Sequence, residues 1–347
     1  MLTTVAEKYF NDPQINQALD LLETTLTKHR NTITGIRPAV EELKVSYAQA
    51  MKTLGENRGG ALYYPYIGSG IGNGPFVELA DGSVKYDFII GIGVHYFGHS
   101  HPKLMRAMVK GALANTAMQG HLQQNTDQAK FIATLLKHAN QENANFNHCF
   151  LTTTGVMAGE NALKIAFQKK HPASRVLAFN HCFMGRTLAL SQVTDKAAYR
   201  EGLPATLQVD YLPFYCESDH EGSIKATVTA LKNHIHRYPK QHAAICMELI
   251  QGEAGSWVGN TEFFKEIIKV CKENNIAVIA DEVQTFGRTS KMFAFQHFDL
   301  NNDIDIVTVG KNTQVCATLF RAEFAPRPGL LSQTFTASGA SLAAGQA

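Results

Sequence analysis

The stretch Ile276-Ala-Val-Ile-Ala-Asp-Glu-Val283 decides the fold when it is set beside a second stretch, Ile304-Asp-Ile-Val-Thr-Val-Gly-Lys311. Each begins with a short apolar run rich in β-branched residues, which is typical of a buried strand. The first run leads into Asp281, and the second leads into Lys311. Because ligands in open α/β sheets bind at the carboxyl ends of strands, we expect the acid and the lysine in one site.

This pair of residues predicts a site for pyridoxal 5′-phosphate (PLP). Desolvation favours the uncharged, nucleophilic form of a buried lysine, which can then bind an aldehyde covalently. A carboxylate keeps the pyridine nitrogen protonated, so that the ring can accept electrons when a substrate C–H bond breaks. Acids and lysines flank strands in many other α/β proteins, so the prediction also depends on the surrounding residues.

Length and composition exclude several classes of protein. With 347 residues, of which 45% are apolar and 18% charged, the chain can form a large core and about two domains. The net charge is only +2 and the basic residues are scattered, so we expect no nucleic-acid partner. The first 18 residues do not resemble a signal peptide, and no apolar window has the length of a membrane span. We therefore expect a cytoplasmic protein without a membrane partner.

The cysteines and the paired histidines do not predict a metal site. His99 and His101 lie in a turn before a proline, and neither they nor His234 and His236 form a typical ligand set. The six cysteines are widely spaced, and we expect reduced thiols in the core: Cys149, Cys182, Cys216, Cys246, Cys271 and Cys316.

The N-terminal part of the chain has a different pattern from the rest. Residues 14–54 carry apolar positions at helical spacing and predict two amphipathic helices, separated near Gly35 and Pro38. The glycine-rich stretch Gly68-Ser-Gly-Ile-Gly-Asn-Gly74 resembles a phosphate loop, but no strand is predicted before it. We interpret this stretch as a flexible loop.

Later in the chain, strand-like and helix-like runs alternate, which predicts an α/β protein with a mainly parallel sheet covered by helices on both faces. Helices are expected at 159–169 and 261–273. Strands are expected at 149–153, 176–179, 208–213, 243–249, 276–280 and 304–309.

One turn in this series suits an anion. Thr152-Thr-Thr-Gly-Val156 joins a predicted strand to a predicted helix, so free backbone N–H groups at the helix start can bind a phosphate. An ordinary capped helix would have a similar sequence.

From about Gly74 to Ala347 the chain carries six motifs that occur in the same order in the class III aminotransferases, and it resembles that family. The family is the group of acetylornithine, ornithine, lysine 6- and 4-aminobutyrate aminotransferases. The motifs are Tyr86-Asp-Phe with Gly98-His-Ser-His-Pro102, Thr154-Gly-Val-Met-Ala-Gly-Glu-Asn-Ala-Leu-Lys164, Phe183-Met-Gly-Arg-Thr187, Glu248-Leu-Ile-Gln-Gly-Glu253, Asp281-Glu-Val-Gln-Thr-Phe-Gly-Arg288 and Asp305-Ile-Val-Thr-Val-Gly-Lys311.

The resemblance implies the fold type I of PLP-dependent transferases and a role for each matching residue. Lys311 would hold the cofactor covalently and then carry the proton, and Asp281 would bind the ring nitrogen. The resemblance further implies that Val283 and Phe183 cover the two ring faces, that Gln284 approaches the phenolic oxygen, and that Gly155 and Val156 bind the phosphate.

Two more residues are implied to act at the edge of the site. Thr334 matches a threonine that reaches the phosphate of the neighbouring subunit, which implies a homodimer with shared sites. Glu253 matches a carboxylate near the substrate entrance, which the family commonly pairs with an arginine that binds the substrate carboxylate.

The departures from the family pattern concern the phosphate turn and the substrate. Thr154-Gly-Val-Met157 lacks a hydroxyl and a carboxylate that most relatives have, and Met184 and Leu249 replace a histidine and a proline. The residues after Lys311 resemble lysine 6-aminotransferases, whereas Gly91-Ile-Gly-Val94 resembles acetylornithine enzymes. The signals for the amino donor therefore conflict.

The resemblance also divides the chain. Residues 1–75 would form an N-terminal helical extension and loop, and residues 76–347 would form the PLP-binding large domain, with residues near 76–105 contributing to a small-domain segment. Family members continue well beyond the Thr334 region, so we expect most of the C-terminal small domain to be absent.

The expected reaction is transfer of an amino group, from the terminal amine of an ornithine-, lysine- or 4-aminobutyrate-like donor, to a 2-oxo acid such as 2-oxoglutarate. A non-catalytic PLP-binding homologue or partner subunit is an alternative, because one wall of the site would be missing. An aminomutase of the same class is another. A nucleotide-binding α/β protein is disfavoured by the missing strand before the glycine loop.

Overall fold

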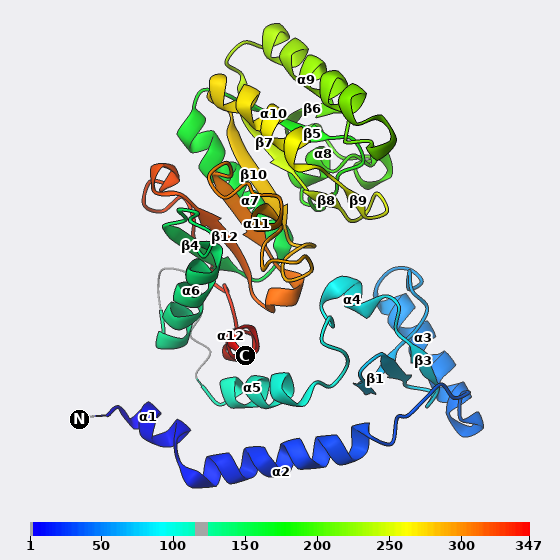
Figure 1. Cartoon of the computed structure of the whole chain (residues 1–347). Coiled ribbons are helices and arrows are strands. Elements are labelled where there is room, and N and C mark those ends of the chain that lie inside the picture. The colour runs from blue at the N-terminus through cyan, green and yellow to red at the C-terminus, as the bar shows by residue number, and fades with distance from the viewer. Residues whose placement is uncertain (1–2, 115–123) are drawn as a thin grey trace. The chain divides into compact units, whose positions relative to one another are not determined.

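The computed structural model describes residues 3–114 and 124–347, which form two compact units (Figure 1). Unit 1 comprises the described residues up to 114 together with 339–345 and 347. Unit 2 comprises the described residues from 124 to 338 together with 346. Each unit is compact by itself, and the division of the chain at residue 75 stays a prediction.

Unit 1 contains the two expected N-terminal helices. The first, α2 (Pro13–Arg30), begins at the N-cap Asp12, whose side chain accepts a hydrogen bond from the backbone N–H of Gln14 at 2.8 Å. The second is α3 (Lys44–Asn57). The remaining helical segments of this unit are α1 (Val5–Phe10), η1 (Glu41–Leu43), α4 (Ile90–Gly93), α5 (Pro102–Ala112) and α12 (Gly339–Gln346), of which Gln346 belongs to unit 2.

The glycine-rich stretch is a strand, so the prediction of a flexible loop was wrong. A three-stranded antiparallel sheet has the order β1 (Gly68–Asn73), β2 (Phe76–Leu79), β3 (Val84–Tyr86). Gly74 turns the chain between the first two strands with φ +57°. A Cβ at Gly72 would overlap the carbonyl oxygen of Phe76 and lie 2.5 Å from the Cβ of His99. The glycine therefore permits close packing of the backbone, a role that a loop pattern does not reveal.

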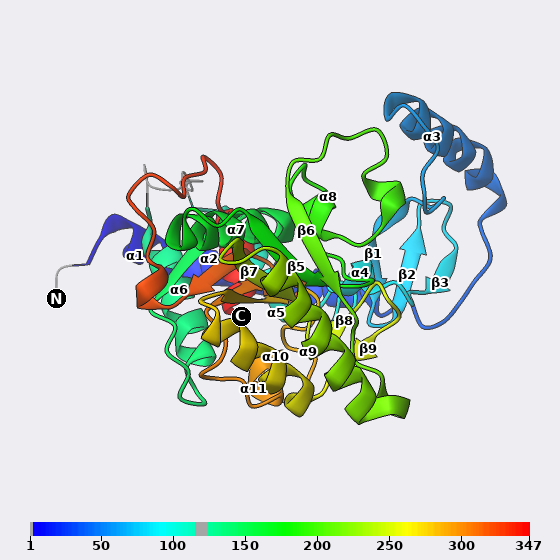
Figure 2. The same cartoon turned by 90° about the horizontal axis from the view of Figure 1, so that it is seen from above.

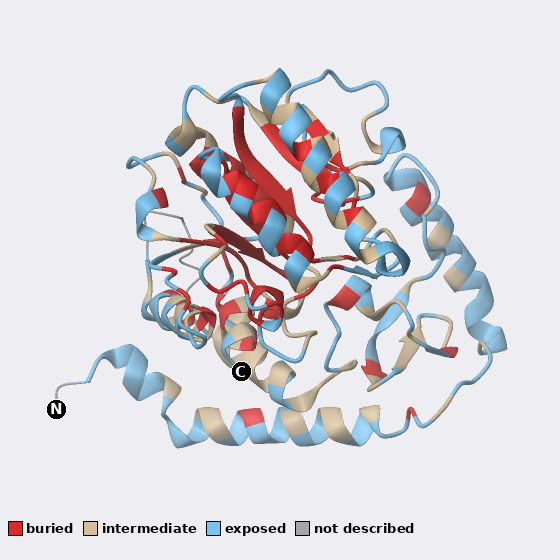
Figure 3. Cartoon of the chain, turned by 45° about the horizontal axis from the view of Figure 1, so that its top comes forward, coloured by how far each residue is buried: buried red, intermediate tan, exposed pale blue. Residues whose placement is uncertain are grey.

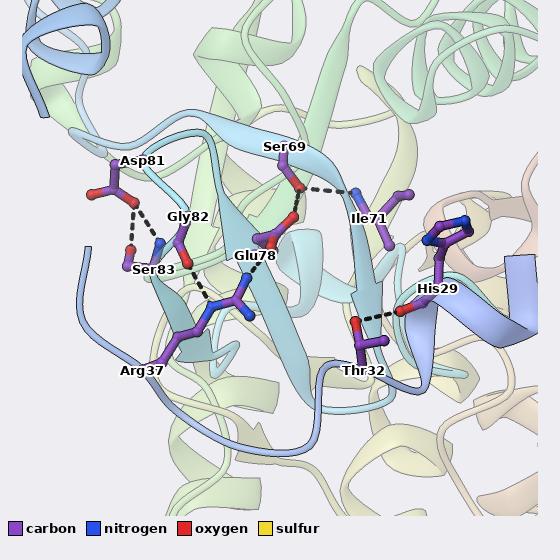
Figure 4. A network of polar contacts seen from close by, with 9 residues as sticks. All are labelled: His29, Thr32, Arg37, Ser69, Ile71, Glu78, Asp81, Gly82 and Ser83. Atoms are coloured by element: carbon purple, nitrogen blue, oxygen red, sulfur yellow. Dashed lines mark hydrogen bonds and ion pairs between the residues drawn. The ribbon is translucent and has the colours of Figure 1, made fainter. Parts of the chain in front are cut away.

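Polar contacts tie the segment after α2 to this small sheet (Figure 4). The guanidinium of Arg37 donates from Nε to the carbonyl oxygen of Gly82 at 2.7 Å and pairs with the carboxylate of Glu78. The same carboxylate accepts a hydrogen bond from the hydroxyl of Ser69 at 2.8 Å. These contacts are partly exposed, so each contributes little to stability and mainly sets the path of the chain.

Unit 2 is built on a seven-stranded sheet with the order β4-β12-β11-β10-β7-β5-β6. Only β12 runs antiparallel to its neighbours, so the prediction of a mainly parallel sheet is confirmed. The strands are β4 (His148–Thr152), β5 (Arg175–Phe179), β6 (Gln208–Leu212), β7 (His242–Met247), β10 (Ala277–Glu282), β11 (Ile306–Val309) and β12 (Cys316–Phe320). A two-stranded ribbon consists of β8 (Ile250–Gln251) and β9 (Trp257–Val258).

Helices cover both faces of this sheet, as the sequence predicts. Figure 2 shows α7 (Gly155–Lys170) on one side of the sheet and α9 (His220–Arg237) and α10 (Thr261–Glu273) on the other. The other helical segments are α6 (Thr126–Ala139), α8 (Leu190–Val193), η2 (Ala197–Tyr199), η3 (Glu217–Asp219), α11 (Ala294–His297), η4 (Lys311–Thr313) and η5 (Ala322–Phe324). Within residues 3–114 and 124–347, no helix combines the length and apolar character needed to cross a membrane.

The core of unit 2 lies along its central strands (Figure 3). Every residue of β7, β10 and β12 is buried, which explains why their sequences are nearly continuous apolar runs. Five of the six cysteines are buried or half-buried as expected, but Cys216 is exposed beside η3.

Candidate active site

The two residues that opened the sequence argument lie on neighbouring strands. β10 and β11 are parallel, with Asp281 opposite Thr308 and Glu282 opposite Val309. Lys311 follows the end of β11 by two residues. Asp281 belongs to β10 itself, which extends to Glu282, rather than following the strand as expected. Both functional groups therefore come from the carboxyl edge of the sheet, the usual ligand side of such folds.

The amine of Lys311 lies in a mostly buried environment. Burial lowers its pKa, the negative charge of Asp281 opposes this change, and the positive charge of Arg288 adds to it. The Nζ atom donates a hydrogen bond to the side-chain oxygen of Gln284. Lys311 also has a backbone φ of +52°, in the left-handed region that non-glycine residues rarely adopt. An amine with a lowered pKa is a better nucleophile near neutral pH, which is the chemistry expected of this lysine.

The carboxyl group of Asp281 is almost fully buried, with 7% of the residue exposed. Burial raises its pKa to about 6, while a hydrogen bond from the backbone N–H of Val283 at 2.9 Å and the charge of Lys311 lower it. A cationic group placed next to this carboxyl would hold it ionised. The protonated ring nitrogen of a pyridine is such a group.

Val283 lies where three strand ends meet. A Cβ at Gly155 would lie 2.8 Å from its Cγ1 atom, and a Cβ at Gly310 would lie 3.2 Å from the same atom. These two glycines therefore let the start of α7 and the end of β11 close around the valine side chain. The site thus has an apolar wall between the acid and the helix start.

The expected phosphate turn has the predicted form. β4 ends at Thr152 and α7 begins at Gly155, with Thr154 as the N-cap. The hydroxyl of Thr154 accepts a hydrogen bond from the N–H of Met157 at 3.3 Å. The backbone N–H groups of Gly155 and Val156 belong to the first turn of the helix, where amides have no partner within the helix. They can bind an anion, as helix N-termini commonly do.

Phe183 follows β5 and is half-buried. Its backbone N–H donates to a carboxylate oxygen of Glu248 at 2.8 Å. Its ring meets the ring of Tyr199 edge to face, with centroids 6.2 Å apart. The guanidinium of Arg186 lies 3.9 Å from the centre of the Tyr199 ring and 5.9 Å from that of Phe183. A stacked cation therefore lies beside the aromatic residue expected to cover the cofactor.

Glu253 lies in an exposed turn after β8. Its carboxylate accepts hydrogen bonds from Nζ of Lys196 at 2.8 Å and from the hydroxyl of Tyr199 at 3.2 Å. The bond from Lys196 lowers the pKa of Glu253, and the charge of Arg186 contributes a smaller lowering. The family resemblance implies an arginine partner for this carboxylate, but its ion-pair partner among the described residues is Lys196.

Thr334, the residue expected to reach a neighbouring subunit, is exposed. The preceding residue, Gln333, accepts a hydrogen bond through its side-chain oxygen from the hydroxyl of Thr152 at 2.6 Å. The segment that carries Thr334 is therefore attached to the end of β4, next to the phosphate turn.

Sequence reasoning missed several residues that the fold brings to this site. Arg186 and Glu248 lie within motifs that were recognised, but no role was predicted for either. Lys196 and Tyr199 lie at η2, an irregular segment without the periodicity of a helix or strand. Only tertiary contacts connect these residues with Phe183 and Glu253.

The described residues fit PLP. The site combines a mostly buried amine with a lowered pKa, a buried carboxyl group on the adjacent strand, a close-packed valine and a helix start suited to a phosphate. Such a site at the carboxyl edge of a mainly parallel sheet, covered by helices on both faces, has the features expected of a PLP site in the fold type I class of proteins.

Comparison with known families identifies the group within this class. The model of the family "Aminotransferase class-III" matches residues 69–344. The chain therefore belongs to the class III aminotransferase family, whose members depend on PLP.

Curated relatives include several acetylornithine aminotransferases. The chain is 31% identical to that of Methanocaldococcus jannaschii over 268 residues, which cover 73% of this chain and 61% of the relative. It is 33% identical to that of Bacillus anthracis over 246 residues, which cover 69% of this chain and 57% of the relative. The chain thus spans about three fifths of the length of these relatives.

Solved structures share the fold at lower identity. The lysine aminotransferase from M. tuberculosis matches with a TM-score of 0.75 and 22% identity, over 86% of this chain and 75% of that one. The taurine:2-oxoglutarate aminotransferase from Bifidobacterium kashiwanohense, solved in complex with PLP and glutamate, matches with a TM-score of 0.74 and 20% identity, over 86% and 71%. These likenesses establish the fold.

Proposed function

We propose that this chain transfers an amino group from the terminal amine of an ornithine-, lysine- or 4-aminobutyrate-like donor to a 2-oxo acid such as 2-oxoglutarate. The observation that carries the proposal is the placement of Lys311 and Asp281 at the carboxyl ends of adjacent parallel strands, where Asp281 is buried and burial lowers the pKa of the Lys311 amine. The family membership of the chain supports the same reaction.

In this proposal Lys311 has two tasks. Its amine would hold the cofactor covalently and would be freed when a donor amine takes its place. The freed Nζ atom would take a proton from the donor carbon and deliver it to the cofactor carbon, which a lowered pKa makes possible near neutral pH. Bound PLP supplies a ring that accepts the electrons of the broken C–H bond, and Asp281 keeps the ring nitrogen protonated.

The remaining residues would orient the cofactor. Val283 and Phe183 would cover the two faces of the ring, and Gln284, which accepts the hydrogen bond from Lys311, would lie near the phenolic oxygen. Gly155 and Val156 would donate backbone N–H groups to the phosphate. We propose a homodimer in which Thr334, exposed in this chain, contributes to the phosphate site of the partner.

The donor would be held by its carboxylate. Arg186 is an exposed cation stacked on Tyr199, next to Phe183, and a guanidinium binds a carboxylate through two parallel hydrogen bonds. Glu253, held by Lys196 and Tyr199, would lie at the same entrance. This arrangement suits a donor with a carboxylate at one end and an amine at the other.

The test is the absorbance spectrum of the purified protein mixed with PLP. We expect a cofactor band that is absent from Lys311→Ala and that bleaches when the correct amine is added, with ornithine, acetylornithine, lysine and 4-aminobutyrate tried in turn. A band that no amine changes would favour the non-catalytic, PLP-binding alternative. Absence of a band in the wild-type protein would contradict the assignment of Lys311.

A further inference from the structure

Glu248 is a buried acid beside the site for which the proposed reaction has no role. It follows β7, the neighbour of β10, and the register pairs Met247 with Ala280. The next residues along these parallel strands are Glu248 and Asp281, with 5% and 7% of each residue exposed. A buried carboxyl group is costly unless its oxygens are satisfied, so its contacts indicate its purpose.

Both oxygens of this carboxyl group are bound by backbone amides of the two loops that frame the site. Oε2 accepts the N–H of Phe183 at 2.8 Å, and Oε1 accepts the N–H of Gly252 at 3.3 Å. Gly252 in turn packs on Gln284, because a Cβ there would lie 3.0 Å from Cγ of that side chain. One side chain therefore joins the aromatic residue, the turn that leads to Glu253, and Gln284.

The pKa of Glu248 is also raised, and it is raised further than that of Asp281. Burial raises the pKa of Glu248 to about 8, with Asp281 raising it further and the backbone of Phe183 and the charge of Lys311 lowering it. The charge of Glu248 in turn adds to the burial that raises the pKa of the nearby Cys182 thiol. Burial thus raises the pKa of both carboxyl groups, to about 6 for Asp281, and the negative charge of Asp281 adds to the rise at Glu248.

We propose that Glu248 is a positioning residue of this site: its carboxyl group holds the backbone of Phe183 and Gly252, and thereby the aromatic ring and the Glu253 turn, in place beside Asp281 and Lys311. Glu248 acts on the reaction only through these loops. The inference rests on the proposed function, because the walls that it orders are those of the PLP site.

The first test measures hydrogen exchange of single backbone amides in the full chain by NMR, with and without PLP. Glu248→Gln replaces one of the two accepting oxygens with an amide NH₂, which cannot accept, so we expect exchange of the amide that faces it, that of Phe183 or Gly252, to become about tenfold faster or more. Unchanged exchange at both amides would overturn the proposal.

Glu282 provides a matched control. It is also a buried glutamate at the end of a strand, and its carboxylate accepts the N–H groups of Ala294 at 2.6 Å and Phe295 at 2.8 Å. Glu282→Gln should accelerate exchange of at least one of those two amides and leave Phe183 and Gly252 unaffected. If both variants accelerate exchange at Phe183 equally, the effect is a general loosening of the core and the proposal is wrong.

The second test separates positioning from a purely structural role. In protein loaded with PLP, Glu248→Gln should shift the pH midpoint of the cofactor band and lower kcat with little change in KM, and Glu248→Asp should restore part of both. Faster exchange with an unchanged midpoint and kcat would mean that Glu248 is merely structural. Failure of the wild-type protein to form a band would instead reject the proposed function, so the two failures are distinct. If Glu248→Gln does not fold, Glu248→Asp provides the same comparison, with smaller changes expected.

Discussion

Two buried aspartates on the same sheet, Asp210 and Asp281, differ in how the surrounding protein compensates their charge, and only Asp281 belongs to the proposed PLP site. Asp210 lies on β6, where Arg175 donates to both of its oxygens at 2.8 and 2.7 Å and His242 contacts it at 2.8 Å. Burial raises the pKa of Asp210, but the hydrogen bonds from Arg175 and His242 lower it below its usual value. The cost of burying the Asp210 carboxylate is therefore offset by its hydrogen bonds with Arg175 and His242.

Asp281 lacks such compensation. Its pKa is raised to about 6, because burial outweighs the hydrogen bond from Val283 and the charge of Lys311. Asp210 therefore stabilises the folded chain in its charged form, whereas Asp281 is held in a position that costs stability until a cation binds beside it. Functional sites commonly keep such an imbalance, and it is more informative than the presence of an acid alone.

The largest effect on activity is expected from a substitution of Lys311. Lys311→Ala should remove covalent attachment of PLP and abolish turnover, since it removes the amine proposed to hold the cofactor. The measurement is the mass of the protein after borohydride reduction, together with amino-group exchange. A variant that still exchanges amino groups would show that the active lysine lies elsewhere.

Asp281→Asn should lower kcat by about a hundredfold or more, because it removes the charge that holds the ring nitrogen protonated. Its stability should be equal to or greater than that of the wild-type protein, since an uncompensated buried acid is lost. Parallel measurements of kcat and of urea unfolding test both parts. An unchanged kcat would remove Asp281 from the mechanism.

Asp210→Asn should have the opposite profile. Breaking the pair with Arg175 leaves a buried guanidinium without its carboxylate, which typically costs about 3–5 kcal/mol of unfolding free energy. Turnover per folded molecule should not change, because Asp210 and its partners Arg175 and His242 belong to the region where β5, β6 and β7 begin. A large loss of kcat under conditions where the variant is fully folded would show that Asp210 also contributes to turnover and would contradict the prediction.

The two acids should also differ in the sign of their pH dependence. The folded pKa of Asp281 is above its unfolded value, so stability falls as pH rises from about 4 through about 6, by roughly 3 kcal/mol at about 1.4 kcal/mol per pKa unit. Asp210 has a lowered pKa, so its contribution is present above the unfolded value and is lost as pH falls below it. In the absence of PLP, the unfolding free energies of both variants should differ most from the wild type near pH 7, where Asp281→Asn should be more stable and Asp210→Asn less stable, and both differences should shrink toward pH 3. If the unfolding free energy of each variant differed from that of the wild type by the same amount at every pH, the directions assigned to the two pKa shifts would be wrong.

The sequence predicted the strands that carry Asp281 and Lys311, and the strands that it missed have identifiable physical reasons. The apolar runs before Asp281 and Lys311 predicted their strands, since buried parallel strands require near-continuous apolar residues. The strand β12 was missed, because its apolar residues follow Lys311 so closely that no turn signal separates them from the site. The strand β1 was taken for a loop, because glycine spacing does not distinguish a flexible turn from close backbone packing.

The sequence by itself determined the fold class and the family, and it predicted Lys311 and Asp281 as the residues of the PLP site. These inferences depend on local apolar periodicity and on motifs in a set order. Only the tertiary structure decided which polar groups compensate one another. Arg175 lies 35 residues from Asp210, and Glu248 lies 65 residues from the amide of Phe183. Such pairs form where strand order and register place them, and the burial that shifts their pKa values exists only after the sheet is assembled.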